Sequence, residues 1–458
     1  MTNEILHGSF RDPNGNIFIK NGRICRSIKK TYQQNYDFLI DSGLYGNLIS
    51  NNLLIPHLEA NHFDKDENEY KIIEPEIIPF ISYPYEWCFD QLKDSALTTL
   101  EIQKTALEYN MILKDASAYN LQFKNGRPIL IDTLSFEIYD EGSPWIAYRQ
   151  FCENFLAPLA LMSYVDCDLL NLLKTYLDGI PLSTAKNLLH YKARFNMSLL
   201  LNIYLQNLTK TISESKNIGH RTYFIKKNKL TVLMNQLEES ITKLKVKKSS
   251  TVWTNYYDIA DYTENGMNHK KLIVESYLQE TKPAIVWDLG ANDGRFSKLA
   301  SRKGILTVSI DKDHSAVEEN YLISKSDSDG FILPLVIDIT NPSPKLGFKL
   351  EERMSLIDRG PADTVIALGL IHHLIITNNI PINFVASFFN AISRFLIIEF
   401  IPEYDSKAKM MLERKKYFHK DLTQERFEAE FKKFFNILKI TKIKDSERIL
   451  YLLKNHDN

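Results

Sequence analysis

The amino-acid sequence predicts an α/β protein built from two domains. The C-terminal part is expected to form a doubly wound sheet, mostly parallel and ending in an antiparallel hairpin, and the N-terminal part a helix-rich α+β domain. The chain has 458 residues, more than one ordinary hydrophobic core contains. Its second half alternates short apolar segments with helical ones, which is typical of a parallel sheet. Its first half is rich in aromatic residues and proline, and its pattern changes from strand to helix.

Composition and charge argue against several classes of protein. Hydrophobic residues make up 44% of the chain and charged residues 25%, the balance of a soluble globular protein. The formal net charge of −1 argues against nucleic acid as a partner. The four cysteines form no CxxC pair, so they indicate neither a zinc site nor a disulfide framework and fit a reducing cytoplasm. The N-terminus is polar, unlike a signal peptide, and no apolar run approaches the ~18 residues of a membrane-spanning helix.

The first elements of the N-terminal domain are predicted to be strands. The stretch FRDPNGNIFIKNGRICRSI, residues 10–28, predicts a β-hairpin with turn residues at Asp12–Gly15 and again at Asn21–Gly22. The stretch KIIEPEIIPFISYPYEW is expected to be extended, because each proline disfavours helix at the residue before it.

Helices and one further strand pair complete this domain. A helix is predicted from Phe89, where apolar residues recur at spacings of three and four. A strand pair is predicted around the turn Asn125–Gly126, and residues from Trp145 to about Leu208 are expected to be mostly helical. A polar, lysine-rich stretch at 209–250 contains one amphipathic helix. The domain boundary is expected there, with an N-terminal domain at 1–245 and a C-terminal domain at 250–458.

Five strands are predicted for the parallel part of the C-terminal sheet, with helices between most of them. They are Ala284–Asp288, Leu306–Ile310, Ile332–Ile337, Thr364–Leu368 and Phe395–Phe400. The stretch FFNILKITKIKDSERILYLLK adds two strands around the turn at Lys444–Ser446. Together they describe a doubly wound sheet with an antiparallel pair at its end.

The first turn of such a sheet is expected to bind a cofactor. In VWDLGANDGRF an apolar strand ends at Asp288, and Gly290 and Gly294 follow in the loop before a helix. Glycine lets the backbone approach a ligand because no Cβ intervenes, and the start of the helix presents N–H groups.

Two more carboxylates follow later strands. Asp311 ends the next strand, where a carboxylate can accept both ribose hydroxyls. Asp338 ends the third strand and can accept an exocyclic adenine amine, while Ile339 can pack on the ring. The loop lacks the G-x-G-x-x-G pattern of dinucleotide sites, and Asp288 and Asp293 would repel a pyrophosphate. A ligand with a cationic end, such as S-adenosylmethionine, suits these carboxylates better.

The motifs VWDLGANDGRFS, VSIDKD, VIDIT, ALGLIHHL and FLIIEF resemble the ordered motifs of class I S-adenosylmethionine-dependent methyltransferases. The resemblance covers about residues 253–453. It is closest to a bacterial family that includes a rhizobial nodulation-specificity protein. The most specific features are the stretches ITNPSPKLGF, ERMSLIDRGPAD and IIEFIPEYDS. It implies a Rossmann-like domain and a transferase that uses S-adenosyl-L-methionine. The implied cofactor-binding residues are Asp288, Gly290, Asn292, Gly294, Asp311, Asp338, Ile339 and Leu370. Asn292 replaces a glycine of the common loop, and asparagine tolerates left-handed backbone angles.

Candidate catalytic residues lie at the ends of the fourth and fifth strands. His372 and His373 are candidates for a general base, and Glu399 for orienting the acceptor or binding His373. Capping or backbone bonding is an equal alternative for either histidine, and zinc is not expected because the pair lacks the usual ligand spacing. The family resemblance, rather than any residue, implies that the acceptor is a hydroxyl or amine of a small molecule or a glycan precursor.

A second set of polar residues lies in the N-terminal domain. Asp115, Asn120 and Asp132 have a spacing similar to the catalytic loop and metal-binding aspartate of protein kinases and aminoglycoside-type kinases. The resemblance implies that Asn120 and Asp132 hold magnesium if this domain is an active kinase-like fold. The sequence departs from the pattern: Lys114 replaces an arginine, Thr133 replaces a phenylalanine, and there is no glycine-rich loop. The alternatives are an accessory or substrate-binding domain, a bifunctional protein that also binds ATP and magnesium, turn chemistry alone, and a non-catalytic scaffold with a vestigial cofactor site.

Overall fold

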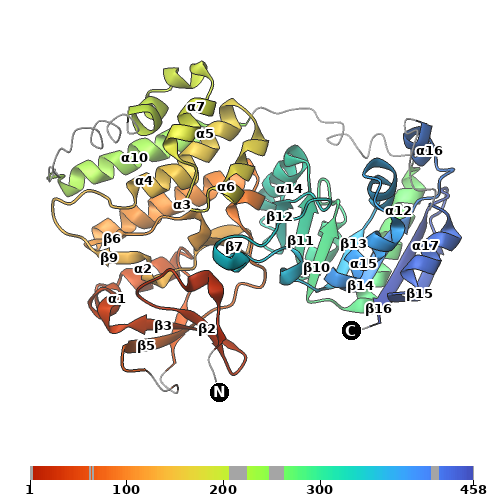
Figure 1. Ribbon diagram of the computed structural model, residues 1–458, viewed down its shortest axis with the longest axis horizontal. Coiled ribbons are helices and arrows are strands. Elements are labelled where there is room, and N and C mark those ends of the chain that lie inside the picture. The colour runs from red at the N-terminus through yellow and green to blue at the C-terminus, as the bar shows by residue number, and fades with distance from the viewer. Residues whose placement is uncertain are drawn as a thin grey trace. The chain divides into compact units, whose positions relative to one another are not determined.

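The structure is a computed structural model that describes residues 4–60, 63, 66–205, 224–246, 262–413 and 422–456. The chain divides into two compact units (Figure 1). Unit 1 comprises Met1–Lys247 and Lys345–Arg353, and unit 2 comprises Lys248–Pro344 and Met354–Asn458. The segment Lys345–Arg353 therefore belongs to unit 1, although its neighbours in the sequence belong to unit 2. Much of the lysine-rich stretch at 209–250 lies outside the described residues.

Unit 1 contains a five-stranded antiparallel sheet in the order β1-β2-β3-β5-β4. Its strands are β1 (Glu4–Ile5), β2 (Ile17–Lys20), β3 (Arg23–Lys29), β4 (His57–Glu59) and β5 (Glu69–Pro75). The predicted hairpin is confirmed, because β2 and β3 pair in antiparallel register across Asn21–Gly22, which both have positive φ. Gly15 lies so close to β3 that a Cβ there would come within 1.9 Å of the Ser27 carbonyl oxygen.

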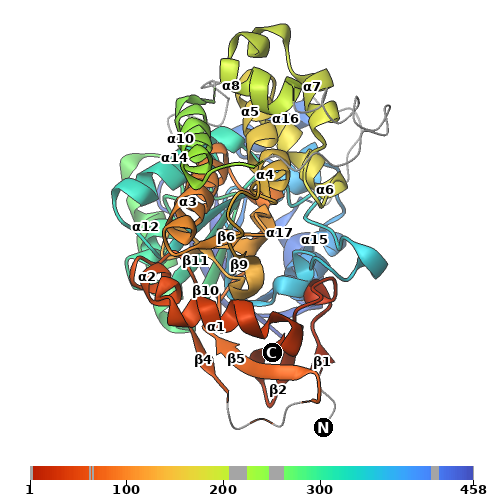
Figure 2. The ribbon, with the colours of Figure 1, turned by 90° about the vertical axis from the view of Figure 1, so that its left-hand side faces the viewer.

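The other described elements of unit 1 surround a long helix, α3 (Phe89–Glu108). The apolar side of α3 packs with α2 and with the short pairs β6-β9 and β7-β8, so this half of unit 1 has its own hydrophobic core. Figure 2 shows the five-stranded sheet at one end of unit 1, and α5, α7 and α8 at the other. The strands are β6 (Met111–Leu113), β7 (Leu121–Lys124), β8 (Arg127–Leu130) and β9 (Phe136–Ile138). The α-helices are α1 (Gln33–Asp41), α2 (Leu44–Ser50), α4 (Tyr148–Phe151), α5 (Ala157–Tyr164), α6 (Leu172–Thr175), α7 (Leu182–Leu188), α8 (Met197–Leu199) and α10 (Lys227–Lys243).

Unit 2 is a seven-stranded sheet in the order β12-β11-β10-β13-β14-β16-β15. The strands are β10 (Ile285–Leu289), β11 (Leu306–Asp311), β12 (Ile332–Val336), β13 (Ala362–Ala367), β14 (Ser393–Phe400), β15 (Phe435–Lys442) and β16 (Ile449–Asn455). The first five strands run parallel, and β16 pairs antiparallel with both β14 and β15. The mostly parallel sheet and its terminal antiparallel pair are therefore as predicted.

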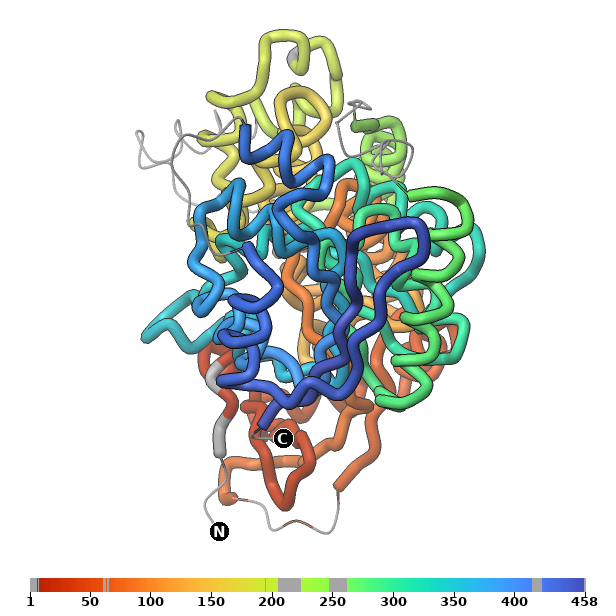
Figure 3. The backbone as a smooth tube through the Cα atoms, turned by 90° about the vertical axis from the view of Figure 1, so that its right-hand side faces the viewer, coloured from red at the N-terminus to blue at the C-terminus, as the bar shows by residue number. Residues whose placement is uncertain are grey.

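Helices cover both faces of this sheet. Figure 3 looks onto its edge, with α12 on one side of β15 and β16 and α17 on the other. Apolar residues of α12 enter the core beside strands β10 and β13, and α15 packs against α17. The helices are α12 (Glu264–Thr281), α13 (Ser297–Ser301), α14 (His314–Ser326), α15 (Ile382–Ile392), α16 (Ser406–Glu413) and α17 (Gln424–Phe431). Among the helices of the described residues, none has the length and apolar character needed to cross a bilayer.

The strand order reverses at β10, which lies between β11 and β13. At such a switch point the loops from two neighbouring strands leave toward opposite faces, so a crevice opens beyond the carboxyl ends of the strands. The candidate site lies there.

Candidate active site

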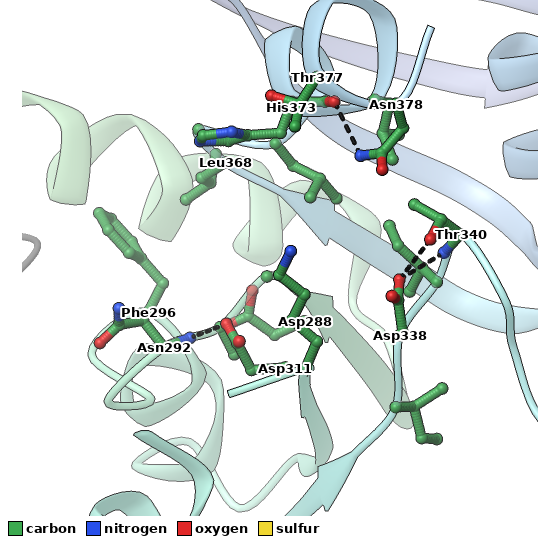
Figure 4. Close-up of a pocket in the computed structure, with 18 of the residues that line it drawn as sticks. Asp288, Asn292, Phe296, Asp311, Asp338, Thr340, Leu368, His373, Thr377 and Asn378 are labelled. Atoms are coloured by element: carbon green, nitrogen blue, oxygen red, sulfur yellow. Dashed lines mark hydrogen bonds between the residues drawn. The ribbon is translucent and has the colours of Figure 1, made fainter. Parts of the chain in front are cut away.

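A largely apolar pocket lies at the carboxyl ends of β10, β11, β12 and β13. Three carboxylates line it, Asp288, Asp311 and Asp338, each from the end of a different strand (Figure 4). The predicted cofactor residues Gly290, Asn292, Ile339 and Leu370 also line the pocket. The sheet thus brings together residues from four loops that are far apart in the sequence.

The loop after β10 turns through left-handed backbone conformations. Gly290 and Asn292 have φ of 74° and 52°, so asparagine does adopt the conformation expected of it. Gly294 also has a positive φ, but it does not line the pocket; a Cβ there would meet the side chain of Asn320 at about 2.4 Å. The absence of a side chain at Gly294 therefore lets the loop pack closely against Asn320. Asp293, expected to face the ligand, instead pairs with Arg295 and does not line the pocket.

Asp288 is buried, with 2% of its surface exposed. Its carboxylate accepts a hydrogen bond of 2.7 Å from the Ser297 hydroxyl at the start of α13. Burial raises the pKa of Asp288 to about 7, against the lowering effects of Ser297 and Lys270. A carboxyl with this pKa is poised to ionise when a cation arrives beside it.

Asp311 is fixed by backbone groups on both of its oxygens. It accepts 2.9 Å hydrogen bonds from the N–H of Asn292 and the N–H of Asp313. Burial raises its pKa, and these two hydrogen bonds oppose that effect. Each oxygen retains a lone pair, so this carboxylate can accept hydrogen bonds from two ligand hydroxyls.

Asp338 lies at the far side of the pocket from Phe296 (Figure 4). One of its oxygens accepts hydrogen bonds from the backbone N–H and the hydroxyl of Thr340, at 2.8 and 2.7 Å. This turn holds the carboxylate beside the apolar side chains of Ile337 and Ile339, which also line the pocket. The arrangement suits a planar, polar-edged group such as a purine.

The two adjacent histidines have different environments. His373 lines the pocket, whereas His372 is 1% exposed and does not line it. Burial and nearby cations, Lys312 first among them, lower the pKa of His373 to about 4. Its imidazole is therefore neutral near pH 7 and can accept a hydrogen bond, but it is a weaker base than a free imidazole.

Glu399 does not line the pocket either. Its buried carboxylate accepts hydrogen bonds from the Lys270 ammonium at 2.8 Å, from the Gly369 N–H at 2.7 Å and from the Tyr262 hydroxyl. His373 is not among these partners, so the proposed interaction between Glu399 and His373 stays a prediction. Glu399 organises residues that do reach the pocket.

Several pocket residues were not predicted from the sequence, among them the polar side chains of Tyr262, Lys270 and Arg448. One signal for Lys270 was present. Buried positions of α12 recur at 266, 270, 273, 274, 277 and 278, so a lysine occupies the core-facing stripe of an amphipathic helix. A lysine at such a position is rarely buried unless it is paired.

Comparison with known proteins gives a family. No protein-family model matches the chain. Nodulation protein NoeA from Rhizobium meliloti (strain 1021) is 31% identical over 459 residues, which covers 98% of this chain and 96% of that protein. The chain belongs to the NoeA family. The predicted resemblance to a family with a rhizobial nodulation protein is thereby confirmed.

Solved structures give only distant matches. The bifunctional kinase-methyltransferase WbdD is 16% identical, with a TM-score of 0.31 over 44% of this chain and 42% of WbdD. Magnesium protoporphyrin IX methyltransferase (ChlM) from Synechocystis PCC 6803, solved with bound SAH, is 18% identical, with a TM-score of 0.32 over 45% of this chain and 95% of ChlM. TM-scores near 0.3 are too low to establish a shared fold, so the function has to be inferred from the site itself.

In this member of the NoeA family, the second set of polar residues, Asp115, Asn120 and Asp132, lies in unit 1. Each of these side chains is bonded to a neighbouring residue. Asp132 accepts hydrogen bonds from the Ser135 hydroxyl at 2.7 Å and pairs with the buried Arg26 guanidinium at 2.9 Å. Asn120 donates to the same Ser135 hydroxyl, whereas Asp115 accepts from Gln150. Within the described residues no group of three or more His, Cys, Asp or Glu side chains is placed to hold a metal ion. Magnesium and ATP binding by this unit stays an untested alternative.

Proposed function

We propose that this protein is an S-adenosylmethionine-dependent methyltransferase whose cofactor binds in the unit 2 pocket. The observation that carries the proposal is the set of three carboxylates at successive strand ends in one largely apolar pocket. Asp311 would accept the ribose hydroxyls, Asp338 the adenine amine, and Asp288 would lie beside the amino acid portion. The glycine turn at Gly290 leaves the room that such a ligand requires.

The charge of the pocket favours this cofactor over a dinucleotide. A pyrophosphate carries two negative charges and would have to lie near Asp288, which is buried, and Asp311, which lines the same pocket. Like charges in a low-dielectric site repel strongly. S-adenosylmethionine instead presents an ammonium and a sulfonium, which these carboxylates would stabilise.

The residues of the pocket suit methyl transfer to a hydroxyl or an amine. The bound cofactor supplies an electrophilic methyl group on a good leaving group. The protein has to orient the acceptor in line with the methyl–sulfur bond and take up the proton that the acceptor loses. His373 lines the pocket as a neutral imidazole and would accept a hydrogen bond from the acceptor, although its lowered pKa makes it a weaker base than a free imidazole. We propose a small molecule or a glycan precursor as the acceptor.

Isothermal titration tests the proposal. We expect S-adenosylhomocysteine to bind the full-length protein far more tightly than ~1 mM, the range of weak ligands, and NAD not to bind. If NAD binds while S-adenosylhomocysteine gives no heat, the proposal is wrong.

A further inference from the structure

Five polar side chains, four of them buried and one partly buried, form a cluster at one end of the pocket. We call it the charged cluster; it consists of Tyr262, Lys270, Glu399, Asp405 and Arg448. Each of its four charged side chains is at most 8% exposed. Tyr262, Lys270 and Arg448 line the pocket, whereas Glu399 and Asp405 lie behind them.

The cluster is held together by ion pairs and one shared phenol. Lys270 pairs with Glu399 at 2.8 Å, and the Arg448 Nε donates to Asp405 at 2.8 Å. The Tyr262 hydroxyl donates to Glu399 and accepts from Lys270 at 3.3 Å and from Arg448 at 3.2 Å. Burial and the Glu399 carboxylate hold the pKa of Tyr262 well above its ordinary value, so the phenol keeps its proton. Tyr262 is thus fully engaged and fixes both cations.

Among the contacts of the described residues, the two cations nevertheless have hydrogen-bond donors to spare. An ammonium has three N–H donors, and Lys270 uses two of them, toward Glu399 and Tyr262. A guanidinium has five, and Arg448 uses three, two toward Asp405 and one toward Tyr262. The remaining donors belong to buried cations that line the pocket, which is the composition of an anion-binding site.

The cluster lies at a defined end of the pocket. The Lys270 ammonium is 5.0 Å from the centre of the Phe296 ring and 4.7 Å from that of Tyr262. Figure 4 shows Phe296 and Asp338 on opposite sides of Asp288 and Asp311. If Asp338 takes the adenine and Asp311 the ribose, the chain of the ligand continues past Asp288 toward Phe296 and the charged cluster.

We propose that Lys270 and Arg448 bind the α-carboxylate of the cofactor, and that Tyr262 and Glu399 are positioning residues that hold these cations in place. The inference rests on the proposed function. The α-carboxylate is the one anionic group of S-adenosylmethionine, and it lies at the end of the molecule opposite to the adenine. Asp288 would then face the α-ammonium, and the two cations would face the α-carboxylate. Each charged group of the amino acid portion would thus meet a residue of opposite charge.

The test compares two ligands that differ only in this carboxylate, S-adenosylmethionine and its decarboxylated form. Their affinities are measured by titration for the wild type and for the double variant Lys270→Met with Glu399→Gln. The double change removes both charges of the pair, so no buried charge is left alone. The Glu399→Gln change also keeps a side-chain oxygen that can accept the hydrogen bond from the Gly369 N–H. The matched control is Lys442→Met with Glu447→Gln, an exposed pair with side chains more than half exposed.

We expect the wild type to prefer S-adenosylmethionine over the decarboxylated form by about tenfold or more, the value of a charge-assisted hydrogen bond. The double variant keeps Arg448, so it should reduce this preference several-fold rather than abolish it, while its affinity for the decarboxylated form changes little; the control should behave as the wild type. An equal loss for both ligands would mean that the pair is only structural, and an unchanged preference would mean that the carboxylate lies elsewhere; either result overturns the inference.

Two further readouts keep the test decisive. If the double variant does not fold, Tyr262→Phe keeps both ion pairs and the ring and removes only the shared hydroxyl. It should reduce the preference for the carboxylated ligand, and an undiminished preference would overturn the inference. If neither ligand binds the wild type, the proposed function itself has failed, which is a different outcome from binding without discrimination.

Discussion

At the scale of single residues, Asp288 makes the pocket sensitive to pH. Its pKa is raised to about 7, chiefly by burial, so much of the ligand-free protein carries a neutral carboxyl at pH 7. The other charged groups that act on it are Asp311, Lys270 and Asp293. A ligand that brings a cation stabilises the ionised form, so it has to displace the proton when the pH is below about 7. Affinity for S-adenosylmethionine should therefore fall as the pH is lowered, approaching about tenfold per pH unit well below 7.

Titrations at a series of pH values measure this effect directly. At a pH near 6.5 the observed heat should depend on the ionisation enthalpy of the buffer, because a proton is released on binding. Asp288→Asn provides the control, since its affinity should be weaker and much less dependent on pH. An affinity of the wild type that stays constant between pH 6 and 8, about one unit on either side of the raised pKa, would contradict the expectation. The pH dependence of folding stability in the ligand-free protein has the opposite sign to that of ligand affinity. The raised pKa stabilises the fold at low pH, and this contribution to stability is lost as the pH rises through about 7.

Asp311 gives a second prediction at this scale. Asp311→Ala should weaken S-adenosylhomocysteine binding by about 1–3 kcal/mol, because ligand hydroxyls would be left without an acceptor. The change also frees the N–H groups of Asn292 and Asp313, so the thermal stability of the variant has to be measured beside its affinity. Asp327→Ala, which removes an exposed partner of Lys298, should leave affinity unchanged. Full affinity in a folded Asp311→Ala protein would show that the ribose is not bound there.

The site residues differ in how well the sequence could reveal them. Asp311 and Asp338 could be placed because each follows an apolar strand, and the ends of parallel strands meet at one edge. His372 and His373 could not be told apart, because the chain there forms a π-helical turn rather than a regular helix. Glu399 could not be recognised as a partner of Lys270, since 129 residues separate them and only the folded sheet brings them together.

At the scale of elements, the packing of α15 on α17 depends on phenylalanine rings. Phe389 of α15 lies with its ring centre 6.5 Å from that of Phe431 in α17, and both side chains are fully buried. Phe389→Ala should destabilise unit 2 by about 3–5 kcal/mol, because it removes a buried ring and leaves a cavity.

Phe384 on the same helix is the matched control, because it is 64% exposed. Phe384→Ala should change the free energy of unfolding by no more than about 0.5 kcal/mol. Chemical denaturation of both variants measures the difference. Equal effects of the two substitutions would show that α15 does not present Phe389 to the core.

The elements themselves were largely predictable, and their assignment to units was not. Predicted strand ends of the parallel sheet lie within two residues of the observed ones, because alternating apolar segments and turn residues are local signals. The segment Lys345–Arg353 is different. Its link to unit 1 consists of contacts such as the 2.7 Å ion pair between Glu352 and Arg11, whose separation in sequence leaves no local pattern.

At the scale of the whole molecule, the two units have separate hydrophobic cores, so calorimetry should resolve two unfolding transitions. The proposed cofactor pocket is built entirely from residues of unit 2. S-adenosylhomocysteine at 100 times its Kd should therefore stabilise one transition by about 2.7 kcal/mol. Magnesium with ATP should shift neither, because Asp132 is already engaged by Arg26 and Ser135.

Phe389→Ala identifies which transition belongs to unit 2, since its ring lies in the core of that unit. The transition whose midpoint temperature is lowered by this substitution should be the one whose midpoint temperature is raised by S-adenosylhomocysteine. The midpoint of the other transition should respond to neither. A ligand-induced shift of the other transition would place the cofactor site in unit 1. A shift of that other transition by magnesium and ATP would instead show that Arg26 gives way to a metal ion, and would restore the bifunctional interpretation.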